Sequence, residues 1–551
     1  MRASSAVRSL GASVLVGFLH LACSSPQRPA EPPSNPFLPA GAKLINGIMI
    51  DSSRVLERKD YYDRLVDFLA EWGIDTLVWH FSDDHGCSIQ IPGFEQLAAQ
   101  GAFTVEETRL WVCRARDKGI DIVPELESFG HSRYITDHPE FKHLAAGPVT
   151  KRLTYDALDP ANPETLVLVG GLVEAVSGLF PSPYIHLGCD EVEVSDYLRD
   201  KSLDETAVSS AYLNALFDRA RRCGKTPMIW DDYVVQRPAI AARLPKDIVI
   251  VHYNYDQDVP AGTTGPIRRL GFDRILLAPA LSSSHERILP SQKALLNTSA
   301  MARLRSSQGL MGVLNTIWLP QRYIQNAMYY GIAYSGYAVA HDGIVDLAAF
   351  HREFARKVFS TDLTPVLDDF LRKWTYLEFD VIELPVFRMI LERSFGIDSW
   401  QSALVSDVNE TAAKLLTEAS GYVPEKNADI WNGMVLAVRT AWALSEGLIL
   451  KNAPADARRA ADFRAKLDAL ILDMDAEWDR TRDPADPAKY TAKFGAFADS
   501  HLLLVLRDLQ TAFAAAAEQE NGASLRLGWI VVFAAMGLVL LVLLTRRRKG
   551  S

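Results

Sequence analysis

The sequence predicts an α/β protein, with a (β/α)8 TIM barrel over residues 43–344, a helical region over 345–520 and a single transmembrane helix over 527–545. Eight short apolar runs precede residue 320, and amphipathic helical patterns separate several of them. Strands that are apolar throughout are buried on both faces, which is typical of a parallel sheet covered by helices. A doubly wound open sheet is the alternative arrangement of the same elements.

The eight expected strands share a short apolar run that ends at polar or aromatic residues. They are residues 43–50, 75–81, 119–126, 184–190, 226–232, 247–254, 273–281 and 310–318. Between them, residues 59–73 and 104–119 have apolar positions at helical spacing and end in a glycine that can close a helix. After about residue 345 the strand pattern stops and helical patterns continue, which predicts the helical region.

Residues 1–23 have the pattern of a secretory signal peptide. Two arginines precede a short apolar stretch that ends at Cys23, and a Pro/Ser-rich tether follows over 24–42. The Ala22–Cys23 step resembles a bacterial lipoprotein cleavage site, so lipidation of Cys23 stays open. We expect export of the chain in either case.

Residues 527–545 are uncharged, apolar and long enough to cross the hydrocarbon core of a bilayer. The basic tail 546–551 follows at once, and by the positive-inside rule it should stay in the cytoplasm. The sequence therefore predicts a membrane-anchored protein whose catalytic domain lies on the extracytoplasmic side.

The composition is that of an ordinary globular protein, with 48% hydrophobic residues and a net charge of −10. This acidic balance gives no reason to expect a nucleic acid as partner. Apart from Cys23, the cysteines Cys87, Cys113, Cys189 and Cys223 allow three pairings, among which the sequence does not choose. No Cys/His cluster has metal-ligand spacing, so we expect neither a metal nor a cofactor. The oligomeric state is left open.

Polar and aromatic residues recur where the expected strands end. They are Asp51, Arg54, His80, Asp83, Asp84, Glu125, Glu127, His131, Asp190, Glu191, Trp230, Asp231, Asp232, His252, Tyr253, Asn254, Tyr255, Asn315 and Trp318. In such a barrel, the carboxyl ends of the strands carry the active site. Each residue alone has a structural explanation, but together they indicate a sugar pocket, because rings stack on pyranose faces while carboxylates bind hydroxyls.

Asp190 and Glu191 are neighbours at the end of the fourth expected strand. Successive side chains of a strand point to opposite faces, so the two acids can converge only if the strand ends there and the backbone turns. Two acids suggest glycosidic cleavage. In ordinary glycosidases the acids come from separate positions and flank the bond. Neighbouring acids fit better a mechanism in which the substrate supplies the nucleophile.

Several motifs resemble those of the family 20 glycoside hydrolases, the β-N-acetylhexosaminidases. HLGCDEV (186–192) resembles the H-x-G-[GC]-D-E motif of that family, and the other matching stretches are GIMIDSSR, LVWHFSDDHG, VPELESFGHS, PMIWDD and NTIW. They cover residues 45–340 in the family order. Cys189, the WDD triplet and IWLPQRY resemble most the hexosaminidase D branch.

The resemblance implies that Glu191 is the general acid and later the base, while Asp190 orients and stabilises the substrate's 2-acetamido group. The acetamide carbonyl would attack the anomeric carbon and form an oxazolinium intermediate. The remaining implied roles are ring-hydroxyl binding by Arg54, sugar and acetamide walls from Trp230 and Trp318, a supporting network of Asp83 with His131 beside the acid and the substrate, and a sugar contact from Asp232.

The chain also departs from the family pattern. The seventh strand lacks the Tyr-x-Asp that grips the acetamide, and we expect Tyr255 to replace that tyrosine. The resemblance implies removal of terminal, non-reducing β-linked GlcNAc or GalNAc. The alternatives are a non-catalytic sugar-binding protein and a membrane-tethered envelope structural protein. A chitinase-type barrel would need a D-x-x-D-x-D-x-E strand, which is not found.

Overall fold

The structure, a computed structural model, describes residues 44–147, 157–283, 288–377, 399–452, 457–484 and 502–513. The expected signal peptide (1–23), tether (24–42), transmembrane helix (527–545) and basic tail (546–551) lie outside these ranges.

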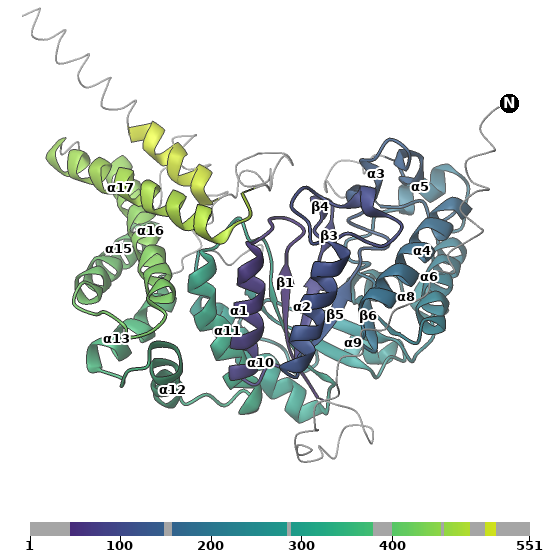
Figure 1. The fold of residues 1–551 in the computed structure, drawn as a ribbon, viewed down its shortest axis with the longest axis horizontal. Coiled ribbons are helices and arrows are strands. Elements are labelled where there is room, and N and C mark those ends of the chain that lie inside the picture. Colours follow the sequence, from purple (N-terminus) through teal and green to yellow (C-terminus); the bar gives the residue numbers. More distant parts are fainter. Residues whose placement is uncertain are drawn as a thin grey trace, which may run out of the picture. The chain divides into compact units, whose positions relative to one another are not determined.

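Eight parallel strands form a closed barrel (Figure 1). They are β1 (Ile45–Asp51), β2 (Thr76–His80), β5 (Asp121–Glu125), β6 (Tyr184–His186), β7 (Thr226–Trp230), β8 (Val249–Tyr253), β9 (Ile275–Ala278) and β11 (Gly312–Ile317). Each strand pairs with the next, and β1 also pairs with β11. This last pairing closes the sheet, so the TIM barrel is confirmed and the open-sheet alternative is wrong.

The seventh expected strand, 273–281, is not continuous. β9 ends at Ala278, and a separate strand β10 (Ala280–Ser282) pairs with β11 in a shifted register. Pro279 lies between them, and proline cannot donate to a ladder, which explains the interruption. A short hairpin of β3 (Ser82–Asp83) and β4 (Gly86–Cys87) was not foreseen.

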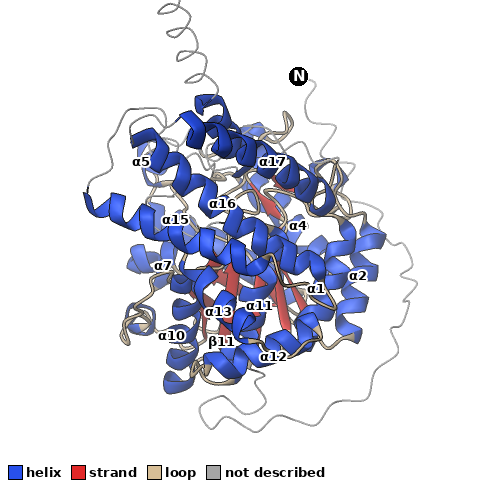
Figure 2. Cartoon of the chain, turned by 90° about the vertical axis from the view of Figure 1, so that its left-hand side faces the viewer, coloured by secondary structure: helices blue, strands red, loops and turns tan. Residues whose placement is uncertain are grey.

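Helices surround the strands, as Figure 2 shows. They are α1 (Lys59–Glu71), α2 (Val105–Asp117), α3 (Arg133–Thr136), α4 (Pro163–Leu179), α5 (Ser195–Asp200), α6 (Glu205–Arg222), α7 (Asp232–Gln236), α8 (Pro238–Ala241), α9 (Gly265–Arg269), α10 (Gln292–Gln308) and α11 (Gln325–Ala340). α2 begins with a capping box between Thr104 and Glu107. The glycines expected to close α1 and α2, Gly73 and Gly119, both have positive φ.

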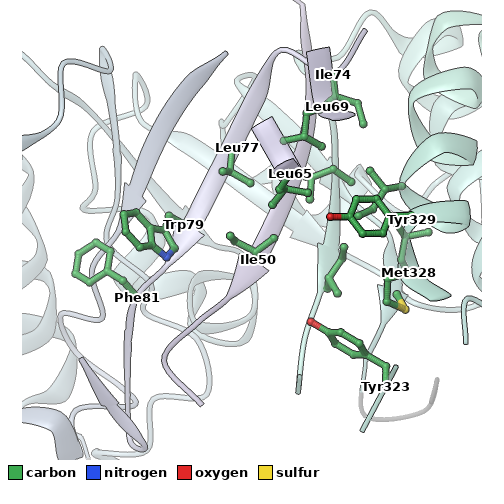
Figure 3. Close-up of a cluster of buried hydrophobic side chains, with 14 of the residues drawn as sticks. Ile50, Leu65, Leu69, Ile74, Leu77, Trp79, Phe81, Tyr323, Met328 and Tyr329 are labelled. Carbon is green, nitrogen blue, oxygen red and sulfur yellow. The ribbon is translucent and has the colours of Figure 1, made fainter. Parts of the chain in front are cut away.

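Along the barrel strands, successive side chains point alternately into the barrel and outward to the helices. In β1, Ile48 and Ile50 pack with the surrounding helices, whereas Ile45 and Met49 belong to a separate cluster inside the barrel. Figure 3 shows Ile50 in the outer layer, close to side chains such as Leu65 of α1. The inward-pointing residues at the strand ends are therefore the ones that face the barrel mouth.

The last inward positions of four neighbouring strands carry an alternating layer of acids and imidazoles. Asp51 pairs in register with His80, His80 with Glu125, and Glu125 with His186. All four side chains are buried. This polar layer forms the base of the barrel mouth.

The chain continues in a helical region of α12 (Leu347–Phe359), α13 (Pro365–Lys373), α15 (Ser399–Ala419), α16 (Ala428–Asn452) and α17 (Ala457–Thr481), with a further helix over 502–513. α16 packs on α11 of the barrel. Gly433 of α16 permits close approach, since a Cβ there would lie 2.6 Å from the Cβ of Asn326. Asn326 also donates a buried hydrogen bond to Glu477 of α17, 2.9 Å long. These contacts confirm a helical region packed on the barrel.

One helix in the part of the chain that the structure describes, Ala428–Lys451 of α16, is long and apolar enough to cross a bilayer. However, 72% of its most apolar window is buried within the protein, which is the situation of a core helix. It is not the span expected over 527–545, which stays a prediction.

The four cysteines that the structure describes, Cys87, Cys113, Cys189 and Cys223, are all free thiols. None of the three pairings that the sequence permits is formed.

Packing of α16 on α11 can be tested with Gly433→Ala. The added methyl group would contact the backbone and Cβ of α11, and we expect a loss of roughly 1–3 kcal/mol in the free energy of unfolding, measured by urea denaturation. The control is Gly178→Ala, near the end of α4, where nothing lies within 4 Å. Helix propensity should there give a gain of about 0.5–1 kcal/mol. Equal effects of the two substitutions would contradict the proposed close packing.

Candidate active site

The backbone turns sharply directly after β6. Gly188, Cys189 and Glu191 have φ of 62°, 71° and 49°, in the left-handed region. For a residue other than glycine this conformation costs roughly 1–2 kcal/mol, so the surrounding structure must hold it. β6 consequently ends at His186 rather than at residue 190 as expected. The turn breaks the alternation that would otherwise separate Asp190 from Glu191.

Contacts from the loop after β5 and from the start of α7 hold this turn. The Ser128 hydroxyl donates a hydrogen bond of 2.6 Å to the carbonyl of Leu187, and the Asp232 carboxylate accepts one of 2.9 Å from the backbone N–H of Glu191. Gly130 lies so close to the carbonyl of Asp190 that no Cβ would fit. A Cβ at Gly188 would likewise overlap the Glu127 carboxyl group.

His131 joins the two neighbouring acids. Its Nε2 lies 3.5 Å from Oδ2 of Asp190 and 3.4 Å from Oε2 of Glu191, and its Nδ1 lies 3.3 Å from Oδ2 of Asp83. Burial lowers the pKa of His131, but the carboxylates of Asp190 and Asp83 outweigh burial and raise it well above its usual value. Burial in turn raises the pKa of Asp190, and the His131 cation outweighs it and lowers that pKa. The pair is therefore an imidazolium beside an ionised carboxylate.

Arg54 joins this network through Asp83, on the side away from Asp190 and Glu191. Its guanidinium donates to Asp51 at 2.7 Å, pairs with Asp83 at 2.8 Å and lies 5.3 Å from the ring centre of Trp318. Burial raises the pKa of Asp83, but Arg54 and His131 outweigh it and hold the pKa well below its usual range. Asp51 also accepts from the backbone N–H of Leu319, and so links the ends of β1 and β11.

The layer of acids and imidazoles below contains a second imidazolium. His80 lies 3.3 Å from both Asp83 and Glu125. Although burial lowers the pKa of His80, Glu125 and Asp83 raise it to about 10, so this imidazole is protonated. Burial and the nearby Asp190 raise the pKa of Glu127 well above its usual value.

Aromatic rings line the opposite side of the mouth. The indole of Trp230 donates to Glu125 at 2.8 Å, and its ring centre lies 5.8 Å from that of Trp318. Trp318 donates to the hydroxyl of Tyr255 at 2.8 Å. Tyr253, a strand-end residue of the expected sugar pocket without an individual predicted role, lies between Trp230 and Tyr255, with ring centres 6.0 and 5.5 Å away.

The structure thus brings all nine predicted site residues into one connected group. A continuous series of contacts links Tyr255, Trp318, Arg54, Asp83, His131, Asp190, Glu191 and Asp232, and Trp230 joins through Trp318. Two placements refine the expected roles. The guanidinium of Arg54 is shared between two buried carboxylates, and the contact of Asp232 is to the backbone of Glu191.

Residues 46–264 match the model of the glycosyl hydrolase family 20 catalytic domain. The chain carries a family 20 glycosyl hydrolase domain. Among curated proteins, it is 28% identical over 239 residues to a β-hexosaminidase of Vibrio furnissii, covering 37% of this chain and 39% of the relative. It is 26% identical over 253 residues to human Hexosaminidase D, covering 41% and 50%. The chain thus matches half of these relatives or less.

Among solved structures, the family 20 exo-β-N-acetylglucosaminidase of Vibrio harveyi in complex with N-acetylglucosamine is similar at 22% identity and a TM-score of 0.45, covering 54% of each chain. The two curated relatives differ little in identity, so the branch within family 20 stays a prediction.

Two groups of three side chains bring possible metal ligands within 4.8 Å of one another: His80 with Glu125 and Glu127, and Asp83 with Asp84 and His131. Both groups contain a histidine whose pKa is raised by carboxylates. In both groups the histidine already pairs with the carboxylates, so these side chains take part in the charge network of the site.

Sequence reasoning placed Asp51, His80 and Glu125 among the strand-end residues without an individual role, and it missed His186. The signal was present, since each is the last inward residue of its strand. His186 differs from His80 because its Nδ1 accepts from the backbone N–H of Gly188, and burial lowers its pKa. It therefore supports the start of the turn as a neutral ring.

The close contact between Gly188 and Glu127 predicts that Gly188→Ala is severely destabilising. The methyl group would overlap a buried carboxyl group and would also carry the left-handed backbone, so we expect a loss of roughly 2–4 kcal/mol in unfolding free energy. Gly73→Ala is the matched control, because Gly73 has φ of 67° with nothing within 4 Å. A similar loss in both variants, measured by urea denaturation, would mean that the Glu127 contact is unimportant.

Titration of Asp232 predicts a pH-dependent stability. Burial, followed by the charge of Asp190, raises the pKa of Asp232 to about 7. Between pH 4 and 7 the folded state then binds more protons at Asp232 than the unfolded state, so this residue makes folding less favourable as pH rises.

We expect Asp232→Asn to gain stability relative to the parent protein as the pH rises from 4 to 7. The relative gain should reach at least about 1 kcal/mol, because one pKa unit corresponds to about 1.4 kcal/mol. Urea denaturation at several pH values measures it, with the exposed Asp117→Asn of α2 as the control. A pH-independent difference would contradict the raised pKa.

Proposed function

We propose that this protein is a β-N-acetylhexosaminidase that removes terminal, non-reducing β-linked GlcNAc or GalNAc by substrate-assisted, retaining catalysis. The family 20 domain supports glycoside hydrolysis of such sugars. The observation that carries the mechanism is the convergence of Asp190 and Glu191 on one nitrogen of His131.

In an ordinary glycosidase the two carboxyl groups come from separate positions of the chain and flank the scissile bond. Asp190 and Glu191 instead come from one turn and lie within 3.5 Å of the same imidazole nitrogen. They are therefore placed to act on neighbouring atoms of one sugar. The nucleophile then belongs to the substrate, and a 2-acetamido group can supply it through its carbonyl oxygen.

The charges suit this division of work. Glu191 protonates the leaving oxygen while the acetamide carbonyl oxygen forms a bond to the anomeric carbon and the glycosidic bond breaks. Asp190 stays ionised because His131 lowers its pKa, so it can stabilise the positive oxazolinium ion. Glu191 then removes a proton from the attacking water. This water opens the oxazolinium ring at the anomeric carbon, with net retention of the anomeric configuration.

Trp230 and Trp318 supply the apolar walls, with Tyr255 held against Trp318. Aromatic rings such as these can stack on the apolar face of a pyranose. Arg54 pairs with Asp83, and Asp83 in turn contacts His131, so this series of charges supports the balance beside the acid.

We also propose that the domain is anchored in a membrane through residues 527–545 and lies on the extracytoplasmic side. The apolar run, its basic flank and the N-terminal export pattern support this topology.

Release of 4-nitrophenol from its N-acetyl-β-glucosaminide and N-acetyl-β-galactosaminide tests the activity. We expect turnover by the full-length protein and a loss of about 10²–10⁴-fold in kcat/KM for Glu191→Gln and for Asp190→Asn. A thiazoline that mimics the oxazolinium ion should inhibit competitively.

Glu193→Gln is the matched control, since Glu193 lies two residues from the acid and its side chain is 49% exposed beside Arg237. Its turnover should be unchanged. A folded protein that binds GlcNAc without turning over either substrate would instead be a sugar-binding protein.

A further inference from the structure

Asp232 makes an unusual contact with the acid Glu191. It is the first residue of α7, and its Oδ2 accepts a hydrogen bond from the backbone N–H of Glu191 across 41 positions of the sequence. The contact is to the main chain of the acid. Its other carboxyl oxygen, Oδ1, is buried without a hydrogen-bond partner among the residues that the structure describes.

The side chain of Glu191 has little else to direct it. It is 40% exposed, and its recorded polar side-chain contact in the described part of the chain is His131 at 3.4 Å. Its direction therefore follows from its backbone, which is left-handed at φ 49°. A hydrogen bond to the N–H of that residue fixes the peptide plane from which the side chain projects.

The support behind Asp232 is rigid. Tyr233, the next residue of α7, is buried and packs edge-on against Phe129 with ring centres 5.4 Å apart. On the other side, the neighbouring Asp231 bonds the ring of His252 at 2.6 Å. Both flanking residues are thus fixed by the core, so Asp232 is a fixed point against which the turn is held.

We propose that Asp232 is a positioning residue for the general acid: through the backbone N–H of Glu191 it aims the acid at the leaving oxygen. This role rests on the proposed function. It differs from the expected contact of Asp232 with the sugar, and it makes a distinct kinetic prediction.

The prediction concerns the leaving group. In the first step the glycosidic C1–O bond breaks, the acetamide oxygen bonds C1, and the proton of Glu191 moves to the departing oxygen. A sugar leaving group needs this proton, because an alkoxide is a poor leaving group. A 2,4-dinitrophenolate leaves without it, so a misdirected acid slows the former substrate far more than the latter.

The experiment compares chitobiose and 2,4-dinitrophenyl N-acetyl-β-glucosaminide as substrates of the full-length protein. For Asp232→Ala we expect kcat/KM to fall about 10–100-fold on chitobiose and by less than about 3-fold on the dinitrophenyl substrate. Asp232→Asn retains an oxygen that can accept from the Glu191 N–H, and should recover most of the loss. If the alanine variant does not fold, the isosteric Asp232→Asn replaces it in the test, and a large loss of kcat/KM that is equal on both substrates would overturn the positioning role.

Asp231→Asn is the matched control: this adjacent carboxylate bonds His252 and the backbone N–H of Tyr253 instead of Glu191. Any loss in that variant should be equal on both substrates. Equal losses on both substrates for Asp232→Ala, or a raised KM with unchanged kcat, would overturn the positioning role. Absence of turnover in the parent protein would overturn the proposed function itself, and this inference with it.

Discussion

The site depends on one backbone constraint, the left-handed turn between β6 and the two acids. A regular strand would send Asp190 and Glu191 to opposite faces. The turn brings them to one imidazole, and it exists because Gly188 fits against Glu127 and Gly130 fits against the carbonyl of Asp190. The surrounding loops thus stabilise a conformation that the local sequence would not adopt alone.

The charges around the turn form a second layer of constraint. Asp83 lies between the cations of Arg54 and His131, and His80 lies between the carboxylates of Asp83 and Glu125. Each buried charge thereby has an opposite neighbour, which is the condition under which burial is tolerated. Because these residues come from separate strand ends, the ionisation of Asp190 depends on closure of the barrel.

The barrel could be predicted because each buried strand leaves a continuous apolar run, and the mouth could be predicted because polar residues follow those runs. Two features could not. The continuation of the seventh strand as β10, in a shifted register, depends on its partner β11, and the link from Asp232 to Glu191 joins side chain to backbone across 41 positions. A single sequence carries no pattern for such a contact. The motifs identified which residues meet, whereas the structure shows through which atoms they contact one another.

Burial differs between the two acids in the direction that their proposed roles require. The Asp190 side chain is 16% exposed and pairs with a buried cation, so its charge is held against protonation. The Glu191 side chain is 40% exposed, and a group that gives a proton to the leaving oxygen and takes one from water must reach both. Exposure leaves Glu191 with few packing contacts to fix its direction, and this is why its orientation has to be set through the main chain. The opposite arrangement, with a buried Glu191 and an exposed Asp190, would weaken both proposed functions. Water would screen the charge of Asp190, and the proton of Glu191 would have no path to exchange with solvent.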